Sequence, residues 1–254
     1  MKRIESPQNS LFKQWKKLMS TRKERDKTSE FLVEGFHLVE EALKKEGTIL
    51  TLIVREGTDI PSGWDTEQLQ IVELTHDLIK ELTDTEHTQG IFAHCRQPEY
   101  SEEEQSTWKR VLLIDAVQDP GNVGTMIRTA DAAGVDGIVL GKGSADPYNP
   151  KTVRSAQGSH FHLPIVKGNM YTWVNRLKAS SIPVYGTALK NAVPFHEIEA
   201  TSQFGLIVGN EGAGIDEELL TMTDQNVTIP ILGQAESLNV AVATGVLLFN
   251  LTKS

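Results

Sequence analysis

The sequence predicts an α/β protein with two domains, and three observations support this. Short apolar runs typical of strands alternate with amphipathic helical segments along the chain. In the second half the apolar runs are continuous, which is typical of a parallel sheet covered on both faces. Between the halves, residues 98–107 (PEYSEEEQST) are acidic and nearly devoid of apolar side chains, which indicates a linker. We therefore expect a small N-terminal α/β domain over residues 1–100, a linker over 101–107 and a parallel-sheet domain over 108–254.

Hydrophobic periodicity predicts the elements of the first domain. Leu11, Trp15 and Leu18 share one face of a helix expected over residues 6–20. The run FLVEG, from Phe31, predicts a short strand, and the amphipathic run FHLVEEALKK after it predicts a helix. The remaining elements are strands over 48–55, 70–74 and 88–95 and a short helix over 75–82.

The second domain is predicted to repeat this alternation. Strands are expected over residues 110–115, 137–140, 183–188, 204–208 and 227–229. Helices are expected over residues 122–133, 150–157, 171–180, 216–222 and 240–249. The last helix is apolar on nearly all sides, so we expect it to be buried.

Composition limits the class of protein. The chain has 254 residues, of which 39% are hydrophobic and 23% charged, as in soluble globular proteins. No apolar run reaches the length of a membrane span, and the basic N-terminus lacks the apolar core of a secretory signal. Cys95 is the one cysteine, so we expect a reducing, cytoplasmic location and a structural thiol. No metal is expected, and His160 and His162 are assigned to the surface.

Charge is distributed unevenly. The net charge is −9, yet residues 1–27 contain nine Lys/Arg and three Asp/Glu, a net +6, which leaves −15 for the rest. A basic N-terminal arm on an acidic body would hold nucleic-acid phosphate locally. The alternative is a solvated charged helix without a partner.

Polar groups follow a buried strand at residues 119–131 (DPGNVGTMIRTAD), where a turn leads into a helix. Open α/β sheets bind ligands at the carboxyl ends of their strands, so this turn is a candidate site. Asn122 lies near the helix start, and Arg128 is a charge on a largely apolar helix. The alternative is that Asn122 is the N-cap and Arg128 forms a salt bridge. The segment lacks the G-x-G-x-x-G and Walker lysine of nucleotide-binding turns.

Two further strand ends carry polar groups. In residues 206–215 (LIVGNEGAGI), Glu211 stands among glycines that allow positive φ angles and close approach of a ligand, although a tight turn is the alternative. In the run from residue 229 to 249, Ser237 and Asn239 stand with Glu236 before the apolar helix. They either cap that helix or face a ligand. We expect the three turns to converge on one crevice.

These three segments resemble, in order and spacing, the signature motifs of the SpoU/TrmH family of RNA ribose 2′-O-methyltransferases, of the SPOUT superfamily. The resemblance covers about residues 108–252. The stretches FLVEGFHLVEEAL and TQGIFA resemble, more loosely, the family's RNA substrate-binding domain of ribosomal-protein L30e-like fold. Family members often have Pro where Thr88 stands and Ser where Ala156 stands.

The resemblance implies a deep trefoil knot that binds S-adenosylmethionine largely through backbone groups. The matching cofactor positions are Gly209, Ile229 and Leu238, with Thr187, Leu189, Asn210 and Ala241 as further candidates. It also implies a homodimer that packs the first-motif and C-terminal helices, so that Arg128 acts beside residues of a second copy.

The implied catalytic residues are Asn122, Arg128, Glu211, Ser237 and Asn239. A ribose 2′-hydroxyl must be aligned with the methyl group and must lose its proton. Family analogy makes Arg128 the base or the charge that stabilises the alkoxide, and an arginine pKa above about 12 favours the second role. Asn122 would position Arg128 or the ribose. Glu211, Ser237 and Asn239 would hold the ribose and organise the site.

Ribosomal RNA is the favoured substrate, by analogy with the two-domain layout of the family. The alternatives are a tRNA enzyme of the same chemistry and a non-catalytic RNA-binding factor associated with the ribosome. A Rossmann dehydrogenase is disfavoured because the G-x-G-x-x-G turn is missing.

Overall fold

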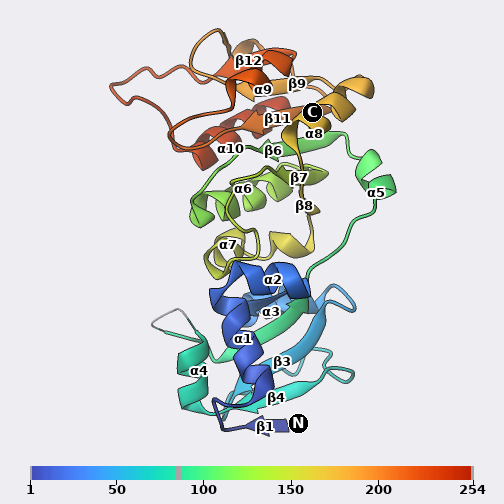
Figure 1. Cartoon of the computed structure of the whole chain (residues 1–254), viewed down its shortest axis with the longest axis vertical. Helices are drawn as coiled ribbons and strands as arrows, with labels where there is room; N and C mark the ends of the chain where they lie inside the picture. The colour runs from blue at the N-terminus through green and yellow to red at the C-terminus, as the bar shows by residue number, and fades with distance from the viewer. Residues whose placement is uncertain (1, 84–86, 253–254) are drawn as a thin grey trace. The chain divides into compact units, whose positions relative to one another are not determined.

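The computed structural model describes residues 2–83 and 87–252, and the chain forms two compact units (Figure 1). Unit 1 consists of Met1–Glu99 together with Tyr148–Phe161, and unit 2 consists of Tyr100–Pro147 together with His162–Ser254. The first boundary between the two units therefore lies near residue 100. The segment Tyr148–Phe161 differs from the expectation, because it packs with the N-terminal unit instead of the parallel-sheet domain.

Unit 1 is built on a mixed five-stranded sheet with the order β1-β4-β3-β5-β2. Strand β5 is antiparallel to both β2 and β3, whereas β4 is parallel to both β1 and β3. The strands are β1 (Lys2–Ile4), β2 (Glu30–Glu34), β3 (Ile49–Arg55), β4 (Ile71–Leu74) and β5 (Ile91–Arg96). The helices are α1 (Ser10–Ser20), α2 (Arg22–Thr28), α3 (Phe36–Leu43), α4 (His76–Leu82) and α7 (Pro150–Ala156), with a 3₁₀ turn η1 (Ser159–Phe161).

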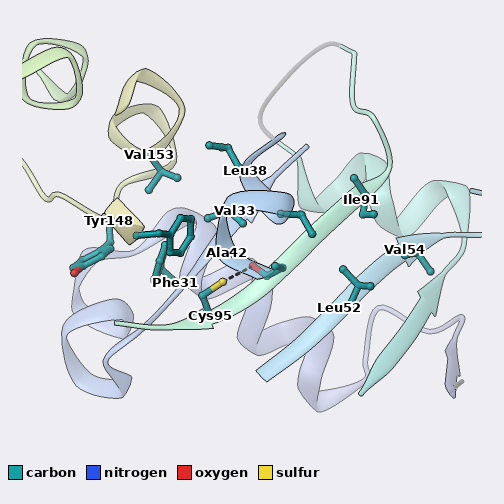
Figure 2. Close-up of a cluster of buried hydrophobic side chains, with 13 residues drawn as sticks. Phe31, Val33, Leu38, Ala42, Leu52, Val54, Ile91, Cys95, Tyr148 and Val153 are labelled. Atoms are coloured by element: carbon teal, nitrogen blue, oxygen red, sulfur yellow. Dashed lines mark hydrogen bonds between the residues drawn. The ribbon is translucent and has the colours of Figure 1, made fainter. Parts of the chain in front are cut away.

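Both faces of this sheet are covered, because successive side chains of a strand point to opposite sides. In β2, Phe31 faces a cluster covered by α3 and α7, while Leu32 faces a second cluster covered by α1 and α4. Figure 2 shows Tyr148 and Val153 beside Phe31 in the first cluster, which explains why this segment belongs to unit 1.

Cys95 is fully buried in that first cluster, and burial raises the pKa of its thiol. A thiol that resists ionisation is a poor nucleophile, so the structural role expected for Cys95 fits its surroundings.

Residues 2–27 of the basic segment do not form a separate arm. They form β1, α1 and most of α2, with Phe12, Trp15 and Leu18 buried in the core of unit 1. The sequence did not predict β1, because a three-residue strand is too short to show a clear periodic pattern. In the fold, β1 pairs with β4, which satisfies its backbone hydrogen-bonding groups and ties the N-terminal segment to the sheet.

Unit 2 contains a seven-stranded sheet with the order β10-β12-β9-β11-β6-β7-β8, and all of its described strand pairs are parallel. This confirms the predicted parallel sheet. Its strands are β6 (Arg110–Ile114), β7 (Gly137–Leu140), β8 (Ile165–Lys167), β9 (Val184–Thr187), β10 (Val193–Pro194), β11 (Phe204–Val208) and β12 (Gln225–Thr228). Its helices are α5 (Glu102–Ser106), α6 (Pro120–Ala132), α8 (Met170–Ala179), α9 (Glu217–Met222) and α10 (Val240–Leu251), with a 3₁₀ turn η2 (Phe195–Glu197).

The predicted linker contains the short helix α5. Ser101 and Glu104 form a capping box, in which each side chain accepts a hydrogen bond from the backbone of the other residue. Acidic residues in the first turn of α5 also suit the positive end of the helix dipole. The same acids that indicated a linker therefore stabilise a helix.

Helix α10 is only half covered by its own chain, so the expectation of a wholly buried helix is wrong for a single copy. It packs against α6 and β11 through a buried face that includes Ala241, Leu247 and Leu248. Val242, Val246 and Phe249 lie on the other side and are 54%, 36% and 53% exposed. No helix in the described part of the chain is long and apolar enough to cross a membrane.

Candidate functional site

The three polar turns lie at one edge of the unit 2 sheet. Strands β12, β9, β11 and β6 are consecutive neighbours, and all run in the same direction. Their carboxyl ends therefore share an edge, at which β11 ends level with β6 in the pair Val208–Ile114.

A chain of side-chain hydrogen bonds joins the three motifs at this edge. The Asn122 amide Nδ2 donates to Glu211 Oε1 at 3.0 Å. The Asn239 amide Nδ2 donates in turn to Asn122 Oδ1, also at 3.0 Å. We call this set the Glu211–Asn122–Asn239 relay. One residue from each motif takes part, so the structure brings together the groups that the sequence predicted to converge.

Local sequence explains how α6 presents Asn122. The N-cap of α6 is Asp119, whose carboxylate accepts from the backbone N–H of Asn122 at 3.0 Å, and Pro120 occupies the first turn. The alternative in which Asn122 is the N-cap is therefore wrong. Because Asp119 caps the helix, the amide of Asn122 is left to bind across the site. The Asp-Pro pair was the signal for this cap.

Asn239 combines the two roles between which the sequence left a choice. Its Oδ1 caps α10 by accepting from the backbone N–H groups of Ala241 and Val242 at 2.9 and 3.3 Å. The cap fixes which end of the amide faces the helix, so Nδ2 points to Asn122.

Glu211 is held as a carboxylate. Partial burial alone would raise its pKa, but hydrogen bonds from Asn122 and from the backbone N–H groups of Gln118 and Asp119 outweigh this, so the pKa lies below its usual value. An ionised Glu211 with three donors around it is a weak base and a strong anchor for the turn that starts α6.

The glycine turn after β11 is shaped by close backbone packing. A Cβ on Gly209 would lie 2.2 Å from the carbonyl carbon of Gly214, so only glycine fits there. Gly214 has a φ of +76°, the one positive φ among the three glycines of this turn. Asn210 accepts from the backbone N–H groups of Gly212 and Ala213, and its amide donates to the carbonyl oxygen of Ala116 at 2.9 Å.

Ala116 was not predicted as a site residue. It has a φ of +54°, a left-handed conformation that costs energy for a residue with a side chain. Asn210 therefore holds a strained residue of the loop between β6 and α6, three residues before Asp119, where the first motif starts. Sequence gave no signal for this position, because alanine is common in unstrained backbone.

Two predicted catalytic residues lie outside the relay. Arg128 is exposed on α6, and its side chain forms no ion pair or hydrogen bond with any described residue, so the predicted alternative of a salt bridge is wrong within one chain. Ser237 is exposed in the loop before α10 and likewise has no partner in the described part of the chain.

The predicted cofactor positions gather at the same edge. Thr187 ends β9, Gly209 follows β11 and Ile229 follows β12. Ala241 is buried in the first turn of α10, and Asn210 stabilises the glycine turn. Leu189 and Leu238 are 75% and 39% exposed, which leaves apolar side chains available to a ligand.

Other ligand sites have less support. A pocket of about 570 Å³, lined by residues that include Asn191, Leu220 and Asp224, lies by the amino end of β12, away from the edge that carries the motifs. The described residues contain no group of three or more His, Cys, Asp or Glu that could hold a metal ion. The expectation of a surface position is wrong for His160, which is buried among Phe31 and Tyr148, whereas His162 is partly exposed and bonds to Asp131.

Residues 109–249 match the model of the SpoU rRNA Methylase family. The chain belongs to this family. Residues 9–93 match the model of an MRM3-like substrate binding domain. The prediction of a SpoU/TrmH-family RNA ribose 2′-O-methyltransferase is confirmed, and the dehydrogenase alternative is excluded.

Full-length relatives agree with this assignment. The 23S rRNA (guanosine(2553)-2′-O)-methyltransferase RlmP of Bacillus subtilis is 55% identical over 99% of both chains. The 23S rRNA (uridine(2479)-2′-O)-methyltransferase of Streptomyces viridochromogenes is 32% identical, over 95% of this chain and 88% of its own length.

Solved structures share the fold. An AdoMet-bound rRNA methyltransferase from Sinorhizobium meliloti superposes with a TM-score of 0.86 at 32% identity, over 98% of this chain and 97% of the other. The SpoU methyltransferase AviRb from Streptomyces viridochromogenes, in complex with AdoMet, gives a TM-score of 0.84 at 30% identity, over 96% and 97%.

Proposed function

We propose that the protein transfers a methyl group from S-adenosylmethionine to the ribose 2′-oxygen of a guanosine in 23S rRNA. The B. subtilis relative named for this reaction matches across both units. Two structures described as tRNA enzymes match only 59% and 56% of the chain, whereas the rRNA enzyme from S. meliloti matches 98%. This difference favours rRNA over the tRNA alternative, and a ribosomal substrate favours the cytoplasm as the place of action.

The relay is the observation that carries the mechanism. Each side-chain amide has two N–H donors, and Asn122 and Asn239 each use one of them within the relay. We infer that the second N–H of each amide holds the ribose 2′-oxygen and stabilises the negative charge that develops as its proton passes to an adjacent phosphate oxygen of the RNA. Glu211 is then a positioning residue, because its lowered pKa and its three donors make it unsuited to accept that proton.

The cofactor is expected at the carboxyl ends of β9, β11 and β12. Backbone groups at Thr187, Gly209 and Ile229 would hold it, together with the apolar side chains of Leu189 and Leu238. The close packing at Gly209 fits a site that depends on backbone shape, as the resemblance to the SPOUT superfamily implies. Bound S-adenosylmethionine supplies an electrophilic sulfonium methyl; the protein aligns the 2′-oxygen with it and excludes water.

The side chain of Arg128 has no ion-pair or hydrogen-bond partner among the described residues of one chain. It is exposed on α6, the helix against which α10 packs, and α10 has an uncovered apolar face. We propose that a second copy covers Val242, Val246 and Phe249 and completes the site around Arg128, which then stabilises the alkoxide or an adjacent phosphate.

The test is transfer of tritium from labelled S-adenosylmethionine to 23S rRNA transcripts and to tRNA. We expect label on 23S rRNA alone, and we expect a single 2′-deoxyguanosine at the mapped nucleotide to abolish it. Label on a base, or on tRNA but not on 23S rRNA, would reject the proposal. Comparison of 2′-O-methyl maps from cells with and without the protein identifies the nucleotide.

A further inference from the structure

Four lysines on α1 and α2 are exposed and have no charge partner within residues 2–83 and 87–252. Lys13 and Lys17 are spaced i, i+4 on α1, and Lys23 and Lys27 have the same spacing on α2. None of the four side chains forms an ion pair or hydrogen bond with any described residue. We call these four residues the α1–α2 lysine face.

Neighbouring cations in the same segment are already in use. Arg3 pairs with carboxylates that include Glu56 and Glu73, and Lys16 pairs with Glu81. Arg25 is buried and donates to the carbonyl oxygens of Leu18 and Met19. Arg3, Lys16 and Arg25 therefore serve the fold, whereas the lysine face does not. The chain contains 34 acidic residues that could pair with lysines, so the lack of partners for this face within the described chain is notable.

The lysine face has a rigid support. Phe12, Trp15 and Leu18 anchor the opposite side of α1 in the core of unit 1. Arg25 ties α2 to the carboxyl end of α1 through its two carbonyl contacts. Like charges at i, i+4 repel each other on a helix by about 0.2–0.5 kcal/mol, and a phosphate against a lysine pair would relieve this repulsion.

We propose that the α1–α2 lysine face binds the sugar–phosphate backbone of the RNA that carries the target ribose; this rests on the proposed function. A protein with a net charge of −9 gains no general attraction to a polyanion, so affinity must come from local patches. Lysines without fixed partners are suited to phosphates, which position an RNA without reading its sequence. Residues 9–93, which match a substrate binding domain, include all four lysines.

The experiment compares the full-length protein with K13Q/K17Q, K23Q/K27Q and the four-lysine variant. Dissociation constants for a 23S rRNA fragment containing the target are measured at several salt concentrations. Neutralising one phosphate contact lowers the slope of log K against log salt by about 0.7–0.9, so the four-lysine variant should lose about 3. The KM for RNA should rise at least tenfold, while kcat at saturating RNA and the Kd for S-adenosylmethionine should stay within twofold.

The control for each pair variant is K109Q/K178Q, which removes two exposed lysines of unit 2 beside the amino ends of β6 and β12. Lys178 pairs with Asp224, so this variant also reports the loss of a lysine that already has a partner. We expect it to leave the salt slope within 0.3 units of the wild-type value, a margin on the order of one third of a phosphate contact. Unfolding curves of all variants check that the helices remain intact.

An unchanged salt slope in the four-lysine variant, with intact methylation of 23S rRNA, would overturn this inference and leave the proposed function standing. Loss of binding to assembled particles but not to the naked RNA fragment would also overturn it and would point to an acidic protein partner. Failure of the wild-type protein to methylate 23S rRNA would instead reject the proposed function.

Discussion

Glu211→Gln is the sharpest test of the relay. In the wild-type protein Oε1 accepts from Asn122 and Asp119, and Oε2 accepts from Gln118. Glutamine has one acceptor oxygen, so its amide nitrogen must face at least one of these donors. The substitution removes the charge from the hydrogen bonds that remain and places two donors against each other at the one that is lost, while side-chain volume is almost unchanged.

The expected size of the effect follows from these three contacts. A hydrogen bond to a charged group contributes about 1.5–3 kcal/mol and a neutral one about 0.5–1.5 kcal/mol. The Glu211 side chain is open to solvent, which screens such differences, so we expect a total loss of stability of only about 1–2 kcal/mol. For a chain of this length that corresponds to a fall in Tm of roughly 2–8 °C. If the relay orients donors onto the 2′-oxygen, kcat should fall by about 10²–10³, the typical cost of losing one such donor.

The assay is steady-state methyl transfer at saturating RNA, which gives kcat, with the Kd for S-adenosylmethionine measured by calorimetry. We expect a cofactor Kd within threefold of wild type and a large loss in kcat. Glu199→Gln is the control, because Glu199 is an exposed acid of unit 2 without a described partner. In a double-mutant cycle Asn122→Ala should show strong non-additivity with Glu211→Gln. A kcat within threefold of wild type, alongside the expected fall in Tm, would refute a catalytic function for the relay.

Four further outcomes are expected. Arg128→Ala should abolish methyl transfer and leave cofactor binding nearly intact, and normal turnover would remove it from the site. Phe249→Glu should shift the protein from dimer to monomer in light scattering, whereas an unchanged mass would show that another surface pairs the copies. Because the folded pKa of Glu211 is depressed, its stabilisation is present above the usual pKa of 4.5 and is lost as pH falls through the folded value; Glu211→Gln should therefore show a shallower fall in Tm below that pH. Tyr148→Ala should destabilise unit 1 by about 3 kcal/mol, because it empties part of the cluster around Phe31, and a change below about 0.5 kcal/mol would contradict the assignment of this segment to unit 1.

Strand prediction succeeded where the apolar run was long enough to be distinctive. Strands β7 and β11 have the predicted limits, because each is a continuous apolar run buried on both faces. Strands β8 and β10 have three and two residues and were not predicted. Such short strands depend on hydrogen bonds to a neighbouring strand, which no local pattern encodes.

The position of the site could be predicted from the sequence, because the carboxyl ends of parallel strands share one edge of the sheet. Polar residues after buried strands indicated convergence, and Asn122, Glu211 and Asn239 do converge. Sequence could not show that these side chains would bond to one another while Arg128 and Ser237 would not. That outcome depends on Asp119, which caps α6 and leaves the amide of Asn122 available.

The wrong prediction for α10 has a mechanistic consequence. An apolar periphery shows that a helix must be covered, but it does not identify what covers it. The exposed residue Val242 lies in the first turn of α10, three residues after Asn239, whose side chain both caps this helix and joins the relay. A second copy that covers Val242 would therefore restrain the end of α10 that positions the amide. Specific activity should then fall on dilution below the dimer dissociation constant even though every relay residue comes from one chain. A constant specific activity across that range would show that the relay works without the second copy and would contradict this coupling.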